Sequence, residues 1–190
     1  MKSTNKYRTA CGGFILISQK AEDHLKAHPE VREIIHEAIG QIKLPSTGLL
    51  STEVELGRVI GKKTRVDTPL CDLDNKILFA RRIGRDKPSR VAPSGSVGED
   101  STKIVVLARP SRSESRTYDL LTSWIGLLAR KEPWDKSITN HEEFQECLGF
   151  WCSNALIHDP AVMGDIFEST WRDVLGEKLN QKGTWAGNPI

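Results

Sequence analysis

The residues best suited to chemistry lie between positions 77 and 91, in the stretch ILFARRIGRDKPSRV. A short apolar run, typical of a strand, leads directly into a segment with one acid, Asp86, and five basic side chains: Arg81, Arg82, Arg85, Lys87 and Arg90. Arginine binds phosphate and carboxylate oxygens in a bidentate manner through its planar guanidinium. The stretch therefore indicates a phosphate-bearing anionic partner, although a solvated loop or salt bridges to the acidic C-terminal region would have the same composition.

Charge is unevenly distributed along the chain, although the total is only +2. Residues 58–116 hold 14 basic and 7 acidic residues, a net charge of +7, whereas residues 117–190 hold 6 basic and 11 acidic residues, a net charge of −5. Such asymmetry indicates a basic binding surface together with an acidic region that shields it, docks on it or keeps the protein soluble.

Side chains for acid–base chemistry are offered by His24 and His28, which are four residues apart and share one face of a predicted helix. Neither belongs to a metal motif, since the chain has no HExxH pattern and no third ligand suggests itself. Two surface histidines on a charged helix are the plainer interpretation. Thr122 lies in the apolar run LLTSWI, where its hydroxyl either faces the open side of a sheet or projects into a cleft and binds a phosphate oxygen.

Several enzyme classes are excluded by missing signatures. The chain has no P-loop, no dinucleotide-binding fingerprint, no nucleophile elbow and no paired zinc ligands. Its four cysteines, Cys11, Cys71, Cys147 and Cys152, lack C-x-x-C spacing and are expected to be reduced and structural. No apolar stretch reaches the ~20 residues of a membrane span or the ~7–15 residues of a signal-peptide core, so we expect a cytoplasmic protein without a membrane partner.

The elements that must position these residues follow the order helices, strands, helices. Helical spacing begins at Ser18 and continues over residues 29–42, β-type runs occupy 54–60, 64–66, 77–80, 103–108 and 117–125, and helical patterns return at 141–157 and 165–179. This order predicts an α+β fold in which N-terminal helices pack on a central antiparallel sheet and are followed by C-terminal helices. We expect a single domain, with a flexible N-terminus over 1–13, a helix-plus-sheet core over 14–126, C-terminal helices over 127–180 and a tail over 181–190.

A helix with histidine, a basic strand and loop, and a later strand with Thr and Ser resemble the small ribonuclease superfamily that includes barnase, EndoU, colicin ribonuclease domains and RelE-like toxins. The resemblance spans roughly residues 17–125. The segments SQKAEDHLKAHPEV, YDLLTSWIG and KEPWD also look like parts of bacterial toxin-like proteins. The resemblance implies RNA cleavage without metal or other cofactor, carried by a few side chains that project from a small antiparallel sheet.

Carried over to this chain, the resemblance implies a catalytic set of His28 or His24, Arg82 or Arg85, and Thr122. His28 would act as base or acid, while Arg82 and Arg85 would stabilise the charge that builds on phosphate. Thr122 would orient a phosphate oxygen. The second acid–base group is left open among Glu53, Glu55, His24 and Tyr118.

Three hypotheses about function follow. The leading one is a toxin-like, metal-independent endoribonuclease with an inhibitor or antitoxin as its protein partner. Its substrate, RNA or another polyanion, would be bound by Arg81, Lys87, Ser89, Arg90, Lys62 and Lys63. The alternative is a non-catalytic module that binds nucleic acid or an acidic protein through residues 77–91. The third is an interaction protein whose acidic C-terminal region forms an oligomer or neutralises the basic sheet.

Overall fold

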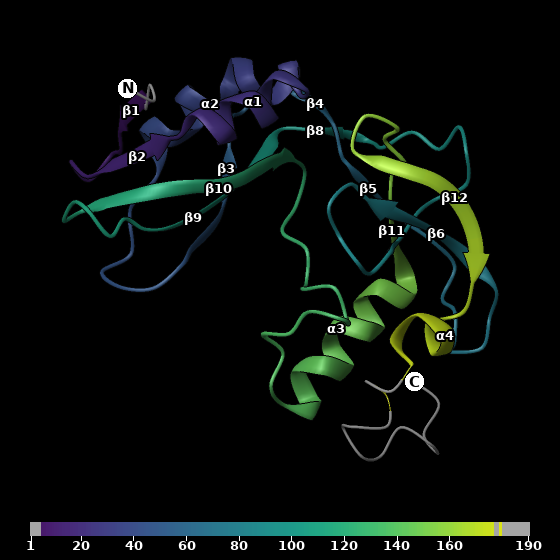
Figure 1. Ribbon diagram of the computed structural model, residues 1–190. Coiled ribbons are helices and arrows are strands. Elements are labelled where there is room, and N and C mark those ends of the chain that lie inside the picture. The colour runs from purple at the N-terminus through teal and green to yellow at the C-terminus, as the bar shows by residue number, and fades with distance from the viewer. Residues whose placement is uncertain (1–4, 177–178, 180–190) are drawn as a thin grey trace. The chain divides into compact units, whose positions relative to one another are not determined.

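The computed structural model describes residues 5–176 and 179 and divides the chain into two compact units (Figure 1). Unit 1 comprises Met1–Thr64 and Glu99–Leu128, and unit 2 comprises Arg65–Gly98 and Ala129–Ile190. Each unit is therefore built from two separate stretches of chain. The single domain expected from the sequence stays a prediction, because two compact units can still fold cooperatively as one domain.

Unit 1 is organised around a five-stranded sheet with the strand order β1-β2-β10-β9-β3. Its strands are β1 (Asn5–Arg8), β2 (Phe14–Ile17), β3 (Leu50–Glu55), β9 (Lys103–Pro110) and β10 (Thr117–Ile125). Neighbouring strands are antiparallel except β2 and β10, which are parallel. A second sheet in this unit pairs β4 (Gly61–Lys62) with β8 (Asp100–Ser101).

Two helices, α1 (Gln19–Lys26) and α2 (Pro29–Gln41), cover one face of the five-stranded sheet (Figure 1). The Ser18 hydroxyl caps α1 by accepting from the Ala21 N–H at 3.3 Å, and Pro29 occupies the first position of α2, where its missing N–H costs nothing. Helical spacing buries one face of α2 through Val31, Ile35, Ala38 and Ile39. These side chains share a buried cluster with Ile104, Val106 and Ala108 of β9, so burial of this apolar stripe holds the helix on the sheet.

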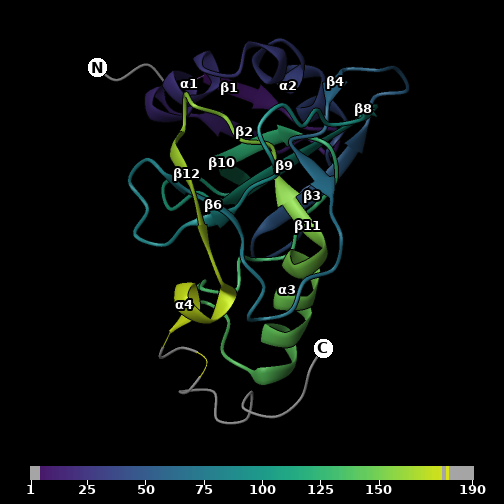
Figure 2. The same cartoon turned by 90° about the vertical axis from the view of Figure 1, so that its right-hand side faces the viewer.

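Unit 2 contains two small sheets and two helices. Its elements are β5 (Arg65–Asp67), β6 (Ile77–Arg82), β7 (Ser89–Arg90), α3 (His141–Ser153), β11 (Asn154–Leu156), β12 (Met163–Ser169) and α4 (Trp171–Leu175). The sheets have the orders β12-β6-β7 and β11-β5. Figure 2 shows α3 running directly into β11, and β12 running directly into α4. The core is aromatic, with Phe79 and Trp171 in an edge contact at 5.0 Å between ring centroids.

The expected fold class, an α+β fold with N-terminal helices on one central antiparallel sheet followed by C-terminal helices, is wrong. Strand residues outnumber helical residues in the described chain, and the strands are spread over four sheets. The largest sheet is mixed rather than antiparallel. The expected C-terminal helical region, 127–180, contains β11 and β12 beside two helices. Order of elements along a chain does not determine which strands pair, and this is where the inference failed.

The helix expected over 165–179 shows the local cause. Ile166 and Phe167 instead pair with Ala80 and Phe79 of β6, where β12 completes the sheet edge. The helix begins only at Trp171, because the Thr170 hydroxyl caps it by accepting from the Asp173 N–H at 3.0 Å.

The expectation for the N-terminus can be compared with the structure, and that for the C-terminal tail cannot. Asn5–Arg8, inside the segment expected to be flexible, forms β1 and pairs with β2. The tail expected over 181–190 lies outside the described residues. Within the described part of the chain, no helix combines the length and apolar character needed to cross a bilayer.

Replacement of Ile104 by alanine tests the core of unit 1. Ile104 of β9 is fully buried in the cluster that the sheet shares with α1 and α2. Ile104→Ala is therefore expected to lower the free energy of unfolding by about 2–5 kcal/mol. Leu121→Ala, in neighbouring β10 but 45% exposed, is the control and should change it by less than about 0.5 kcal/mol. Urea unfolding followed by circular dichroism measures both, and equal effects would contradict the assigned burial.

Candidate functional site

The basic stretch forms the connection between two antiparallel strands of unit 2. β6 and β7 pair through Phe79 with Arg90 and Ala80 with Ser89, so residues 83–88 must reverse the chain direction. The Arg85 N–H donates to the Arg82 carbonyl at 3.0 Å, and Gly84 between them adopts a φ of 77°, which favours glycine. This turn gathers Arg81, Arg82, Arg85 and Lys87 at one end of the sheet. We call these four residues the cationic edge.

Two arginines of the cationic edge stand out because they are exposed and form no direct ion pair. Arg81 and Arg85 are exposed and form no ion pair with any residue that the structure describes. Many other exposed basic groups are paired, among them Arg58 with Glu37 at 2.6 Å. Lys87 lies between these cases, since its Nζ donates to the Val174 carbonyl at 3.0 Å. Arg81 and Arg85 are therefore free to bind an external anion.

A cluster of buried polar groups lies beside the cationic edge. It consists of Arg82 at the end of β6, Ser89 in β7 and Glu132 in the segment before α3. Arg82 Nε, Ser89 Oγ and Glu132 Oε1 are each buried without a hydrogen-bond partner among the described residues. Buried polar atoms of native proteins are almost always hydrogen-bonded, and here the Ser89 hydroxyl and the Arg82 charge both act on the Glu132 carboxyl.

Glu132 is electrostatically unusual. Burial raises the pKa of its carboxyl, while the positive charge of Arg82, the hydroxyl of Ser89 and the charge of Arg85 each offset part of that rise. The net direction is upward, so the neutral acid is favoured more than in water. A carboxyl with a raised pKa next to two guanidinium groups has the chemistry of an acid–base group beside an anion site.

The remaining predicted binding residues are occupied by structural contacts. Arg90 is buried and donates from Nη1 to the Trp151 carbonyl at 2.9 Å and from Nη2 to the Pro69 carbonyl at 3.4 Å. Ser89 is 1% exposed. Lys62 and Lys63 belong to unit 1 and form ion pairs with Asp100 and Glu99 respectively. None of these side chains lies on the exposed part of the cationic edge.

The two predicted catalytic histidines do lie together. His24 is in α1, His28 precedes α2, and their rings meet edge to face with 5.1 Å between centroids. Burial, and then the nearby His28, lower the pKa of His24, so it is mainly neutral at neutral pH. His28 Nδ1 lies 3.8 Å from Glu30 Oε1.

Thr122 lies on the other face of the same sheet. A bulge between Leu120 and Thr122 shifts the register of β10 against β9, so that Thr122 pairs with Leu107 and Ser123 with Val106. Val106 faces α1 and α2, and side chains alternate along a strand, so Leu107 and Thr122 face away from the helices. Thr122 therefore does not join His24 and His28 in one site.

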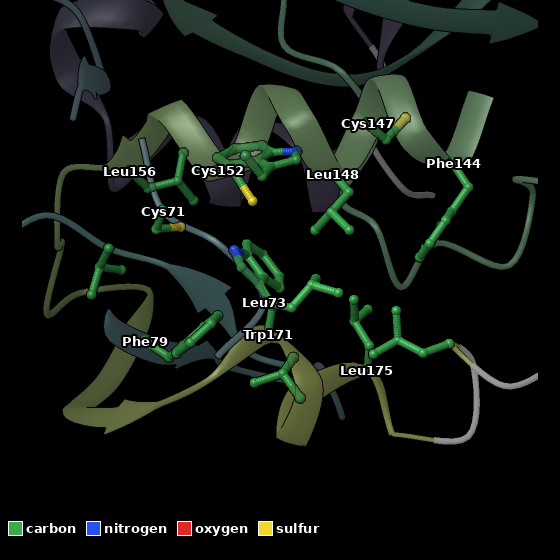
Figure 3. Packing of buried hydrophobic residues seen from close by; sticks show 14 of the residues in the cluster. Cys71, Leu73, Phe79, Phe144, Cys147, Leu148, Cys152, Leu156, Trp171 and Leu175 are labelled. Carbon is green, nitrogen blue, oxygen red and sulfur yellow. The ribbon is translucent and has the colours of Figure 1, made fainter. Parts of the chain in front are cut away.

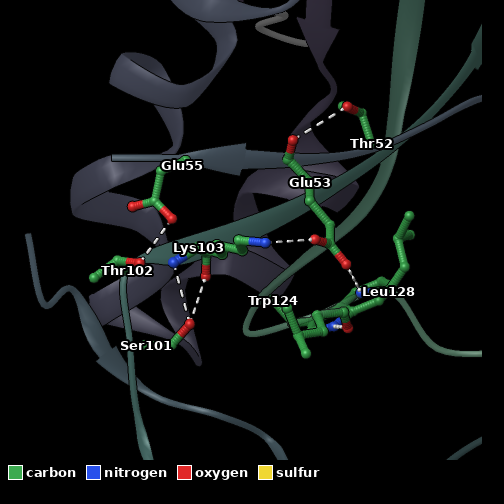
Figure 4. Close-up of polar contacts among 9 residues, drawn as sticks. Thr52, Glu53, Glu55, Ser101, Thr102, Lys103, Trp124 and Leu128 are labelled. Atoms are coloured by element: carbon green, nitrogen blue, oxygen red, sulfur yellow. Dashed lines mark hydrogen bonds and ion pairs between the residues drawn. The ribbon is translucent and has the colours of Figure 1, made fainter. Parts of the chain in front are cut away.

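The groups left open as a second acid or base in unit 1 are engaged in the network shown in Figure 4 or near it. Glu53 accepts from Lys103 Nζ at 3.2 Å and from the Leu128 N–H at 2.7 Å. Glu55 accepts from the Gly57 N–H and the Thr102 hydroxyl, which lower its pKa. Tyr118, buried on the helix side, donates to the Pro45 carbonyl at 3.0 Å.

The predicted catalytic set is thus divided between the two units. His24, His28 and Thr122 belong to unit 1, whereas Arg82 and Arg85 belong to unit 2. The acidic partner of those arginines, Glu132, was missed from the sequence. Its only signal is an acid placed directly before Pro133 and Trp134, two residues that favour burial of their neighbour without identifying its role.

Replacement of Glu132 by glutamine should change how stability depends on pH. The pKa of Glu132 is higher in the folded protein than in the unfolded chain, where it is about 4.3. Its contribution to stability is therefore fully present below about pH 4.3 and is lost as the pH rises through the pKa of the folded protein. The glutamine cannot ionise, so the stability of Glu132→Gln relative to wild type should increase from acid to neutral pH. Urea unfolding across that range measures the difference, and parallel pH profiles would contradict the direction assigned to Glu132.

No family model matches this chain, and no curated protein or solved structure is significantly similar to it. The resemblance to the small ribonuclease superfamily is not tested by these comparisons and stays a prediction.

Proposed function

We propose that the protein binds the phosphate groups of RNA through the cationic edge of unit 2. The observation that carries this proposal is the pair of exposed arginines, Arg81 and Arg85, that form no direct ion pair among the described residues. Phosphate contacts by Arg and Lys supply most of the affinity of nucleic-acid binding without reading the base sequence.

The buried cluster beside the cationic edge supports this proposal. Arg82 adds a third guanidinium next to Arg81 in β6, and guanidinium groups bind phosphate oxygens in a bidentate manner. Burial raises the pKa of Glu132, so its carboxyl opposes the binding of an anion less than an ordinary carboxylate would.

Removal of the two exposed arginines tests the proposal. Arg81→Ala/Arg85→Ala is expected to weaken binding of a fluorescein-labelled single-stranded RNA by about 10-fold to 100-fold. The slope of log affinity against log salt concentration should become shallower by about 0.7 for each phosphate of the single strand that the variant no longer neutralises. Fluorescence anisotropy at several salt concentrations measures both quantities.

The matched control is Arg130→Ala, which removes an exposed arginine of the same unit that is paired with Glu146 at 3.0 Å. It should leave RNA affinity nearly unchanged. Equal losses in the control and the double variant would show that only net charge matters. Preferential binding of polyglutamate over RNA would instead support an acidic protein partner.

Endoribonuclease activity is the second candidate function, and Glu132 is the observation that favours it. Cleavage by the RNA 2′-hydroxyl needs a base for its proton, an acid for the leaving 5′ oxygen and cations for the charge on phosphate. A carboxyl with a raised pKa exchanges protons closer to neutral pH, and Arg82 and Arg85 act on it directly. This assignment places the acid–base group and the cations in one unit.

Cleavage of a fluorogenic RNA in EDTA separates the two candidates. If Glu132 is the acid–base group, Glu132→Gln lowers the cleavage rate by about 100-fold or more while RNA affinity stays close to wild type. Variants His28→Ala and Thr122→Ala then cleave at nearly the wild-type rate. The reverse pattern would restore the catalytic set expected from the resemblance, and absence of cleavage by wild type would leave RNA binding alone.

A toxin-like role, a cytoplasmic location and an inhibitor or antitoxin partner belong to the same proposal. The third sequence hypothesis, a pure interaction protein, gains support if RNA does not bind at all.

A further inference from the structure

Two cysteines from distant parts of the sequence lie side by side in the core of unit 2. Cys71 follows β5, and Cys152 lies in the last turn of α3. The Cys71 N–H donates to the Cys152 carbonyl at 2.9 Å. The two thiols also share a hydrogen bond, which places their sulfur atoms next to each other. Figure 3 shows both sulfur atoms directed into the same part of the buried cluster.

Hydrogen-bond donors surround the Cys71 sulfur. Arg90 Nη1 lies 3.4 Å from Cys71 Sγ and brings a full positive charge. The indole nitrogen of Trp171 is on the side of the two cysteines in Figure 3 and is buried without a hydrogen-bond partner among the described residues. The acceptor that would satisfy this indole N–H is a sulfur that carries negative charge.

The protonation of the pair is strongly asymmetric. The hydrogen bond from the Cys152 thiol, the positive charge of Arg90 and the Trp171 indole outweigh burial and lower the pKa of Cys71 to about 7. The hydrogen bond to Cys71, together with burial, raises the pKa of Cys152. Of the two thiols, Cys71 therefore ionises more readily, and Cys152 keeps its proton more strongly.

The other two cysteines lack this arrangement. Cys147, one turn earlier in α3, has a pKa raised by burial, as expected for an inert core thiol. Cys11 is exposed, belongs to unit 1, and is the lone cysteine of that unit.

We propose that Cys71 and Cys152 form a peroxide-reactive dithiol, in which Cys71 is oxidised first and Cys152 then closes an intramolecular disulfide. The oxidant is a hydroperoxide, of which hydrogen peroxide is the smallest. A buried site next to a guanidinium suits such a small, uncharged oxidant, because a larger disulfide reagent could not reach Cys71, which is 6% exposed.

The reaction balances in two steps. The Cys71 thiolate attacks one peroxide oxygen, the S–O bond forms, the O–O bond breaks, and the leaving hydroxide takes up a proton to give water. The Cys152 sulfur then attacks the Cys71 sulfenic sulfur, the S–S bond forms, and the S–O bond breaks. The departing hydroxide takes the proton of the Cys152 thiol and leaves as the second water. Two thiols lose two electrons in total, and one peroxide gains them.

The first step prepares the second. While Cys71 is a thiolate, its charge and its hydrogen bond keep the proton on Cys152. Conversion of Cys71 to a neutral sulfenic acid removes that charge, so the Cys152 thiol becomes easier to deprotonate and attacks the adjacent sulfur. The disulfide would join the two separate stretches of chain that make up unit 2.

The test uses the full chain with Cys11→Ser, so that the exposed thiol of unit 1 does not react. Hydrogen peroxide should lower the number of titratable thiols under denaturing conditions from three to one, and intact mass should fall by about 2 Da. Tryptic digestion should join the peptide 66–76, which holds Cys71, to the peptide 137–172, which holds Cys147 and Cys152. These measurements need no variant within unit 2.

Two variants then identify the partner. Cys147→Ser is the matched control and should keep the cross-link, whereas Cys152→Ser should lose it and accumulate a Cys71 sulfenic acid that dimedone traps. The oxidation rate should rise with pH through about 7. Cys71 faces Cys152 of α3, Arg90 of β7 and Trp171 of α4, which favour its thiolate, while burial and Asp72 of its own loop oppose ionisation.

Three outcomes would overturn the proposal. In the first, the chain keeps all three thiols at a peroxide concentration that oxidises a model thiol. In the second, the cross-link still forms in Cys152→Ser. In the third, Cys147→Ser abolishes the cross-link. Circular dichroism confirms that each variant is folded. If a variant in unit 2 does not fold, the thiol count, mass and peptide map of the Cys11→Ser chain still test the proposal. RNA binding by the cationic edge is measured separately, so its failure leaves this test intact.

Discussion

The burial of one positive charge, that of Arg90, organises unit 2. A buried guanidinium is tolerated only when its donors are satisfied, and here they reach the Trp151 carbonyl, the Pro69 carbonyl and the Cys71 sulfur. These partners come from α3 and from the segment after β5, while Arg90 itself is in β7. One side chain therefore ties together three elements that no single sheet connects. Within the described residues Arg90 has no carboxylate partner, which leaves Cys71 as the nearest group able to carry its counter-charge.

The position of β7 in turn determines the character of the cationic edge. Arg90 and its neighbour Ser89 are both buried, so both faces of β7 are covered, and the chain reverses direction over residues 83–88. Arg81 and Arg85 are exposed, and the charges of Arg82 and Arg85 act on the Glu132 carboxyl. Packing thus separates one structural arginine, Arg90, from the other basic side chains of the stretch, which can contact an anion.

Local patterns in the sequence predicted local structure well, and they failed where pairing is non-local. The helix over Pro29–Gln41, the Asn140 cap of α3 and the strands at Lys103–Pro110 and Thr117–Ile125 all follow from periodicity and capping residues. The bulge that turns Thr122 away from the helices, the β12 strand and the parallel β2/β10 pair depend on partners distant along the chain. Glu132 escaped notice for the same reason, because its pKa is set by burial and by Arg82, fifty residues earlier.

The same constraint explains why residue type alone cannot distinguish the members of the basic stretch or of the cysteine set. Five basic side chains and four thiols each look equivalent in the sequence, yet a buried charge requires a partner and an exposed one does not. The hydrogen bond from Cys152 and then the charge of Arg90 lower the pKa of Cys71, and the Cys71 sulfur is in turn one of the buried partners of the Arg90 guanidinium. Arg81 and Arg85 are exposed and form no ion pair among the described residues, because water solvates a surface charge that the interior would have to pair.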